Sequence, residues 1–366
     1  MGLDQDWSGI MDAGQSIFEL THELKAVEQK RQELHQKRDS VLSRLSEQLA
    51  QRRQADYGRG QLKRFAYVTL VTGHSGYAIG ALALGASLEN AGSKARRICL
   101  ITESTSVETI DVLIASGLWD IAVVADLPCS ADADARCNKL ALFKRPLDVL
   151  ASLKRYIFLD ADAYVRENLD HLFTTQALEG WPLVGARNCP LWPSKSGVVV
   201  DPCSAHAMPS TKQELREESI SLDPDNFNSG MMLIDPLLAS KTDVLKYVKP
   251  WNQTWDGDQD PLNELFGNSP RLGIEFNTLM CCADLPALGE RAFNAKVVHF
   301  SLKKMKPWDV YKFEAHIESE QVDPNGAIPA FRWWSKGHPF NRLYSEWKRH
   351  FQDALERSIA SVPFEF

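Results

Sequence analysis

The sequence predicts an α/β fold, with a mixed, mostly parallel sheet flanked by helices and one long helix at the N-terminus. Three observations predict it. Tyr156 to Leu159 form an unbroken apolar run, which suits a parallel strand buried on both faces. Strand-like and helix-like stretches alternate from Phe65 to Val124, as they do in parallel sheets. Residues 1–60 instead carry a heptad pattern.

The N-terminal segment, residues 1–60, is predicted to be a long helix that forms a coiled coil. Neither proline nor glycine occurs between Gln15 and Tyr57. Apolar residues recur at steps of three, four or seven: Ile17, Leu20, Leu24, Val27, Leu34, Val41 and Leu45. We expect a homodimer through residues 15–55 or packing on a partner. A solvated single helix is the alternative, because Arg31 and Arg38 occupy positions on the apolar seam.

The second predicted domain spans residues 64–325 and opens with alternating strands and helices. The expected elements are a strand at Phe65–Thr72, a loop at Gly73–Gly76, an amphipathic helix at Tyr77–Asn90, a strand at Arg97–Thr102, a helix at Val107–Ser116 and a strand at Ile121–Val124. Gly80 and Gly85 have the spacing of a phosphate-binding P-loop, but Ala86 stands where its lysine belongs. Both glycines lie inside the expected helix, so helix packing explains them better.

Shorter sequence patterns predict the remaining helices and strands of this domain. They are a helix at Lys139–Leu153 broken by Pro146, a strand at Leu183–Arg187, a proline-punctuated insertion at 188–225, a strand ending at Ile234, a helix at Pro261–Phe266 and a strand at Val297–Phe300. Insertions of that length are either functional or disordered. A C-terminal extension, residues 326–366, contains an amphipathic helix at Pro339–Ser358 that we expect to pack on the core.

Composition excludes several classes of protein. A net charge of -7 argues against a nucleic-acid partner. No apolar stretch approaches the roughly 20 residues of a membrane span, and no secretory signal is visible at the start. The 7 cysteines are scattered, without the spacing of a zinc site. These features predict a cytoplasmic protein with reduced thiols.

Asp160 and Asp162 directly follow the apolar strand, where ligands bind in open α/β sheets. In extended chain, residues two apart point the same way, so both carboxylates can face one ion. Such oxygen ligands suit Mn²⁺ or Mg²⁺. The alternative is an ordinary turn after a strand, since aspartate favours turns. A second copy of the triplet, Asp132-Ala133-Asp134, follows a polar stretch and is predicted to be loop.

Three further positions carry polar groups suited to a ligand. Asn228 lies where a polar corner leads into an apolar strand. Its side chain can bind a sugar hydroxyl, or it forms a local turn. Asp258 and Gln259 precede a helix, where they can grip a sugar ring or simply cap the helix.

His299 lies in a short apolar strand, and a histidine there is usually only a core residue. The basic residues Lys303, Lys304 and Lys306 follow within one loop, where they can neutralise a diphosphate. His299 is therefore predicted to be the third metal ligand, through neutral imidazole.

In their order along the chain, these stretches resemble the glycogenin-like retaining glycosyltransferases of family 8. The resemblance runs from Phe65 to Trp308 and includes Asp160-Ala161-Asp162, Phe227-Asn228-Ser229-Gly230, Asp258-Gln259, His299 and Lys306-Pro307-Trp308. It implies a GT-A type, Rossmann-like fold, Mn²⁺, a UDP-sugar donor and retention at the anomeric carbon. It also implies donor-binding roles: Leu70, Thr72 and Tyr77 would hold the uridine, and Lys139, Asp160 and Lys306 would complete the donor site.

Two departures from the family pattern are visible. The segment 300–305 lacks the glycine that family members place near the diphosphate, so extra lysines compensate for it or phosphate binding is weaker. No tyrosine occurs in Thr278–Arg291, where glycogenin-like members glucosylate themselves. Self-priming is therefore not expected.

The predicted activity is metal-dependent transfer of a hexose, glucose or galactose, from a UDP-sugar to a hydroxyl of a cytosolic glycan or glycoprotein. Asp160, Asp162 and His299 would hold the metal. Four residues are the expected catalytic set: Lys139, Asn228, Asp258 and Gln259. The alternative is an inactive transferase fold that serves as a coiled-coil interaction or scaffold protein.

Overall fold

The computed structural model describes residues 61–73, 75–124, 135–143, 148–188, 227–244, 258–279, 295–301, 306–311 and 339–361, with seven further positions between residues 25 and 40. The chain divides into two units, Met1–Ala55 and Asp56–Phe366. In the first unit the described positions are helical and exposed. The heptad residues lie outside the described residues, so the coiled coil, the homodimer and the predicted domain boundaries stay predictions.

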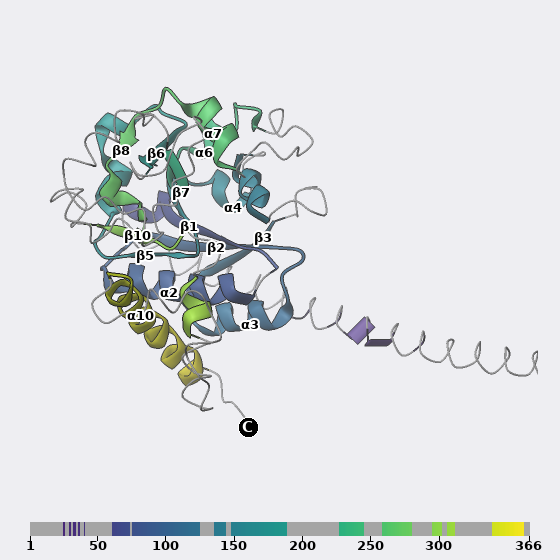
Figure 1. The fold of residues 1–366 in the computed structure, drawn as a ribbon. Coiled ribbons are helices and arrows are strands. Elements are labelled where there is room, and N and C mark those ends of the chain that lie inside the picture. Colours follow the sequence, from purple (N-terminus) through teal and green to yellow (C-terminus); the bar gives the residue numbers. More distant parts are fainter. Residues whose placement is uncertain are drawn as a thin grey trace, which may run out of the picture. The chain divides into compact units, whose positions relative to one another are not determined.

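A seven-stranded mixed sheet, in the order β3-β2-β1-β4-β7-β6-β8, forms the centre of the second unit (Figure 1). Its strands are β1 (Phe65–Val71), β2 (Arg96–Thr102), β3 (Asp120–Val124), β4 (Arg155–Leu159), β6 (Leu183–Arg187), β7 (Phe227–Ile234) and β8 (Arg271–Leu272). β1 to β4 are parallel to one another, whereas β7 is antiparallel to both of its neighbours. The predicted mixed, mostly parallel sheet is confirmed.

Side chains of β1 alternate between two buried layers. Ala66 and Val68 belong to a cluster with Leu142, Phe143 and Phe266. All five residues of β4 are buried, as the apolar run predicted. In Figure 1, α4 (Asp148–Ala151), α6 (Pro236–Ala239) and α7 (Gln259–Phe266) lie on one side of the sheet. On the other side lie α2 (Ser75–Asn90), α3 (Val107–Ala115) and α10 (Pro339–Ser361).

Helix α2 begins two residues before the predicted start and is not amphipathic. It is buried on nearly every side, because α10 packs along the face that would otherwise meet solvent. Its glycines mark close approaches: a Cβ at Gly85 would lie 2.6 Å from Trp119 Nε1, and one at Gly80 would collide with the Ala161 carbonyl oxygen. Helix packing, not phosphate binding, accounts for these two glycines.

Helix α10 extends three residues beyond its predicted end. Its buried residues recur at helical spacing: Leu343, Tyr344, Trp347, Phe351 and Ala354. Glu346 fixes the helix to the core, since it accepts hydrogen bonds from Arg166 Nη2 at 2.7 Å and from the Tyr164 hydroxyl at 2.8 Å. The predicted packing of this helix on the core is confirmed.

A second sheet of three short strands lies beside the first, in the order β5-β10-β9. It consists of β5 (Ala163–Val165), β10 (Val297–His299) and β9 (Thr278–Leu279), of which only β10 was predicted. β10 is antiparallel to β5, and this register sets His299 opposite Ala163. Segments far apart in the sequence therefore meet just beyond Asp162.

One predicted helix needs correction, and three other predictions lie wholly or mostly outside the described residues. Instead of one helix at Lys139–Leu153, a 3₁₀ helix, Ala135–Phe143, and the short α4 are present. Residues 189–225 of the predicted insertion, Asp132 to Asp134, and Lys303 with Lys304 are not described. Among the helices of the described ranges, none combines the length and the apolar character that crossing a bilayer requires.

Candidate active site

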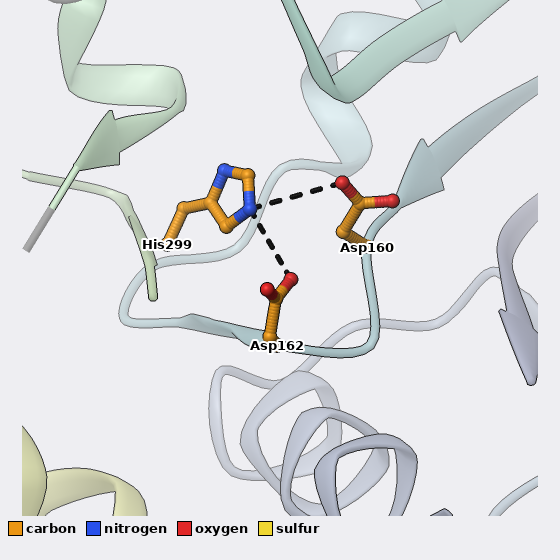
Figure 2. A group of neighbouring side chains, drawn as sticks. All are labelled: Asp160, Asp162 and His299. Atoms are coloured by element: carbon orange, nitrogen blue, oxygen red, sulfur yellow. Dashed lines mark ion pairs between the residues drawn. The ribbon is translucent and has the colours of Figure 1, made fainter. Parts of the chain in front are cut away.

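The structure brings Asp160, Asp162 and His299 together, as Figure 2 shows. One ligand atom from each lies within 4.8 Å of the others. His299 Nε2 is 3.7 Å from Asp160 Oδ2 and 3.2 Å from Asp162 Oδ1. The pairing of β10 with β5 produces this convergence, because it places the histidine beside the residue that follows Asp162.

The backbone geometry of the two aspartates differs from the prediction. The chain turns directly after β4, with the Ala163 amide donating to the Asp160 carbonyl at 3.0 Å. The carboxylates therefore converge through a turn and not through the alternation of an extended strand. The turn is anchored on both sides, since Asp160 N donates to Gly230 O at 2.9 Å and Phe300 N to Asp162 O at 2.9 Å. A turn and two converging carboxylates, posed as alternatives, occur together here.

Lys139 links the candidate metal ligands to Asp258. Its Nζ lies 2.9 Å from Asp160 Oδ1 and 3.0 Å from Asp258 Oδ2, and 3.2 Å from the Ser229 hydroxyl. Burial lowers the pKa of this amine, but the two carboxylates outweigh burial and raise it above its ordinary value. Lys139 is thus a fixed cation that orients two carboxylates, and it cannot act as a proton acceptor near neutral pH.

Lys306 forms an ion pair with Asp162, the second candidate metal ligand. Its Nζ contacts Asp162 Oδ2 and donates to the Phe300 carbonyl at 2.7 Å. Burial raises the pKa of Asp162, but Lys306 and His299 together hold it well below the usual range. For Asp160, burial outweighs Lys139 and raises the pKa. The amine of Lys306 lies against a carboxylate, and its predicted role at a diphosphate stays a prediction.

The residues present fit a divalent cation. Asp162 Oδ1 is buried and has no hydrogen-bond partner within the described part of the chain. It faces His299 Nε2, while the other ring nitrogen lies 3.0 Å from the Asn277 side-chain oxygen. With that nitrogen as the donor, a neutral ring presents a lone pair to the carboxylate, and only a cation or a proton satisfies both. Two carboxylates and one imidazole suit Mn²⁺ or Mg²⁺.

The polar residues predicted to hold a sugar also meet here. Asn228 Nδ2 donates to Gln259 Oε1 at 3.0 Å, and its oxygen accepts from the Gly230 amide at 2.9 Å. Asp258 occupies the N-cap position of α7 without making a side-chain cap hydrogen bond, so the capping alternative is wrong. Asn277 was missed, because nothing in its local sequence distinguishes it from any other loop asparagine.

The residues expected to hold a nucleotide lie at the same edge of the main sheet. Leu70 and Thr72 lie at the carboxyl end of β1, which runs parallel to β4. Tyr77 lies in the first turn of α2, where Trp308 packs edge-on against it with ring centroids 5.2 Å apart. Trp308 also fills the space left by Gly76. These positions are compatible with the predicted role, which stays a prediction.

Comparison with known proteins identifies the family. Residues 75–311 match the model for glycosyl transferase family 8. Human glycogenin-1 is 28% identical over 293 residues, which cover 74% of this chain and 71% of glycogenin-1. Galactinol synthase 6 of Arabidopsis thaliana is 24% identical over 275 residues, which cover 74% of this chain and 79% of the synthase.

The fold agrees with this match. The bifunctional glycosyltransferase WbbM, in its apo form, is 14% identical and aligns with a TM-score of 0.50 over 82% of this chain and 52% of its own. The mixed sheet with helices on both faces is the GT-A type that the resemblance implied. Since the family match covers more than half of the residues, the chain belongs to glycosyl transferase family 8.

Proposed function

We propose that this protein transfers a hexose, glucose or galactose, from a UDP-sugar to a hydroxyl of a glycan or glycoprotein, with retention at the anomeric carbon. The observation that carries the proposal is the convergence of Asp160, Asp162 and His299, in which Asp162 Oδ1 is buried and has no hydrogen-bond partner among the described residues. Family membership supports the reaction class. A metal held by these residues would favour a diphosphate-linked donor, because such ions commonly hold substrate phosphates.

Asp160, Asp162 and His299 would hold Mn²⁺, or Mg²⁺, at this site. The bound ion would supply Lewis-acid stabilisation of the departing diphosphate. Lys306 adds a positive charge directly beside Asp162, where negative charge would develop on the leaving group. Leu70, Thr72 and Tyr77 would hold the uridine.

Asn228, Asp258 and Gln259 would orient the hexose. Asn228 and Gln259 are already joined by a hydrogen bond, so their amides are ordered before a sugar arrives. Asp258 is held by Lys139 and kept near the metal ligands. It is the candidate carboxylate for a covalent route to retention, and attack from the face that the diphosphate leaves is the other route.

The remaining parts of the proposal concern the cell and the partners. We place the protein in the cytoplasm, without a nucleic-acid partner, on the acidic composition and the scattered cysteines. We also propose a homodimer through residues 15–55. Sedimentation of the full chain over a range of concentrations tests the dimer, and a monomer at every concentration contradicts it.

A screen of UDP release across nucleotide sugars, with and without acceptors, tests the reaction. Release should need a divalent cation, stop with a chelator, and be fastest with UDP-glucose or UDP-galactose. Melting temperature with UDP and Mn²⁺ is the companion measurement, because a ligand that binds only the folded state raises its stability. If neither ligand raises the melting temperature, the alternative of an inactive scaffold is favoured.

A further inference from the structure

We propose that Asn277 is the positioning residue of the metal centre, fixing the tautomer and ring orientation of His299 and joining it to Asn228. This proposal rests on the metal site of the proposed function and goes beyond it. Asn277 has 1% of its surface exposed, and both ends of its amide are used. Its backbone joins a 3₁₀ helix, Ile274–Phe276, to β9, which pairs with β10 beside His299.

The direction of each hydrogen bond follows from one unambiguous donor. The Gly230 backbone amide can only donate, so the Asn228 atom 2.9 Å away is its oxygen. That same oxygen lies 2.8 Å from Asn277 Nδ2, which must therefore be the donor. The Asn277 oxygen then faces His299 Nδ1 at 3.0 Å and accepts its proton. In neutral His299 the lone pair is consequently on Nε2, which points at Asp160 and Asp162.

The ring is also confined by packing. His299 is 3% exposed, and a Cβ added at Gly230 would collide with its Cε1 atom. The ring therefore lies directly on the Gly230 backbone, and Asn277 holds its Nδ1 edge. A ligand held this way loses little freedom when it binds a metal. Hydrogen bonds to the far nitrogen of a ligating histidine typically change metal affinity by about 10- to 100-fold.

The side-chain amide of Asn277 also connects the candidate metal site to the residues proposed to bind the sugar. Asn277 donates to Asn228, and Asn228 donates to Gln259 at 3.0 Å. The two functions of Asn277 are therefore separable by substitution. An aspartate can still accept the proton of His299 Nδ1, but it sets a second oxygen against the Asn228 oxygen. Flipping the side-chain amide of Asn228, so that its oxygen and nitrogen exchange places, does not relieve this repulsion. The Gly230 amide would then face the amino group of Asn228 instead of its oxygen.

The test measures Mn²⁺ affinity of the full-length protein by electron paramagnetic resonance of the free ion. Asn277→Ala should weaken Mn²⁺ binding by about 10- to 100-fold. Asn277→Asp should stay within a few-fold of wild type in Mn²⁺ binding, yet raise KM for the nucleotide sugar or lower kcat. Asn277→Leu keeps the volume of the side chain and should behave as the alanine variant does, which covers the case in which alanine fails to fold.

A matched control is Asn263, which also bridges main-chain segments but does not contact His299. It accepts from Phe227 N and donates to Phe227 O, both at 2.8 Å. Asn263→Ala should lower the melting temperature and leave Mn²⁺ affinity unchanged. Wild-type affinity in Asn277→Ala or Asn277→Leu, or an aspartate variant as weak as they are, overturns the proposal.

Failure of the proposed function gives a different result. If wild type binds Mn²⁺ and the variants follow the expected pattern, but no nucleotide sugar is consumed, the role of Asn277 stands and the transfer reaction is wrong. If wild type turns over a UDP-sugar and Asn277→Ala binds Mn²⁺ equally well, the positioning role alone is wrong. A wild type that takes up no Mn²⁺ contradicts both.

Discussion

Replacing Asp162 by asparagine should separate the stability of the site from its chemistry. The change keeps the shape of the side chain but removes the charge that faces Lys306, and the two side chains are 6% and 11% exposed. Breaking a buried pair by removing one partner costs about 3–5 kcal/mol. The asparagine oxygen can still accept from Lys306, as the Phe300 carbonyl does at 2.7 Å, so the lower end applies. About 3 kcal/mol corresponds to a melting temperature lower by about 6–12 °C.

The double variant Asp162→Asn with Lys306→Met gives the decisive comparison. It replaces both partners, so no buried charge is left alone, and most of the lost stability should return. Binding of Mn²⁺ should not return, because the carboxylate ligand is still missing. Glu179→Gln is the matched control: its pair with Lys154 has an N–O distance of 3.0 Å but both side chains are 46% exposed, so the melting temperature should not change.

Differential scanning fluorimetry with and without Mn²⁺, followed by UDP release, measures all of these variants. In wild type, Mn²⁺ should raise the melting temperature, and in Asp162→Asn it should not. A single variant as stable as wild type, or a double variant as unstable as the single one, would refute the argument about the buried pair. Undiminished metal-dependent UDP release in Asp162→Asn would remove the metal site itself.

Three further substitutions test other contacts. Gly230→Ala should displace the ring of His299 and reduce Mn²⁺ affinity by roughly tenfold or more, measured by metal titration. Gly80→Ala should cost about 1–3 kcal/mol in unfolding free energy by denaturant titration, because its Cβ meets the Ala161 carbonyl oxygen. Burial raises the pKa of Glu346, but its arginine and tyrosine partners hold it below 4.5. Its stabilising effect is therefore present above pH 4.5 and lost as the pH falls through the lowered pKa, so Glu346→Gln should lower the melting temperature at pH 7 and flatten its decline in acid.

The sequence predicted the strands whose own residues are apolar enough to indicate burial. β4 is a continuous apolar run, and such runs need no tertiary information to be recognised. β5, β8 and β9 have two or three residues each, and pairing with distant segments, not local preference, makes them strands. Helix α2 was predicted, but its burial on nearly every side was not. Its outer face is covered by α10, which begins at Pro339, far along the chain from α2. Periodicity within α2 cannot reveal that cover.

In the site, residue types were easier to predict than geometry. Asp160 and Asp162 stood out because they follow a buried strand, yet their convergence depends on a turn that the extended-chain argument did not anticipate. His299 was singled out by the lysines after it and by the family resemblance. Asn277 could not be found this way, because its importance lies in partners 22 and 49 positions away. The hydrogen bonds that Asn277 makes to His299 and Asn228 become visible only once β9 and β10 are paired.

The balance of charge explains why metal and nucleotide should bind together. Counted as formal charges, Asp160, Asp162 and Asp258 against Lys139 and Lys306 leave one negative charge in a largely buried site. That charge disfavours an anionic diphosphate, and a bound divalent cation reverses its sign. Lys306 lowers the pKa of Asp162, and Lys139 orients Asp160 and Asp258, but two lysines do not neutralise three carboxylates, so the affinity for a cation is preserved. UDP alone should therefore barely stabilise the protein, whereas UDP with Mn²⁺ should stabilise it by more than the two ligands do separately.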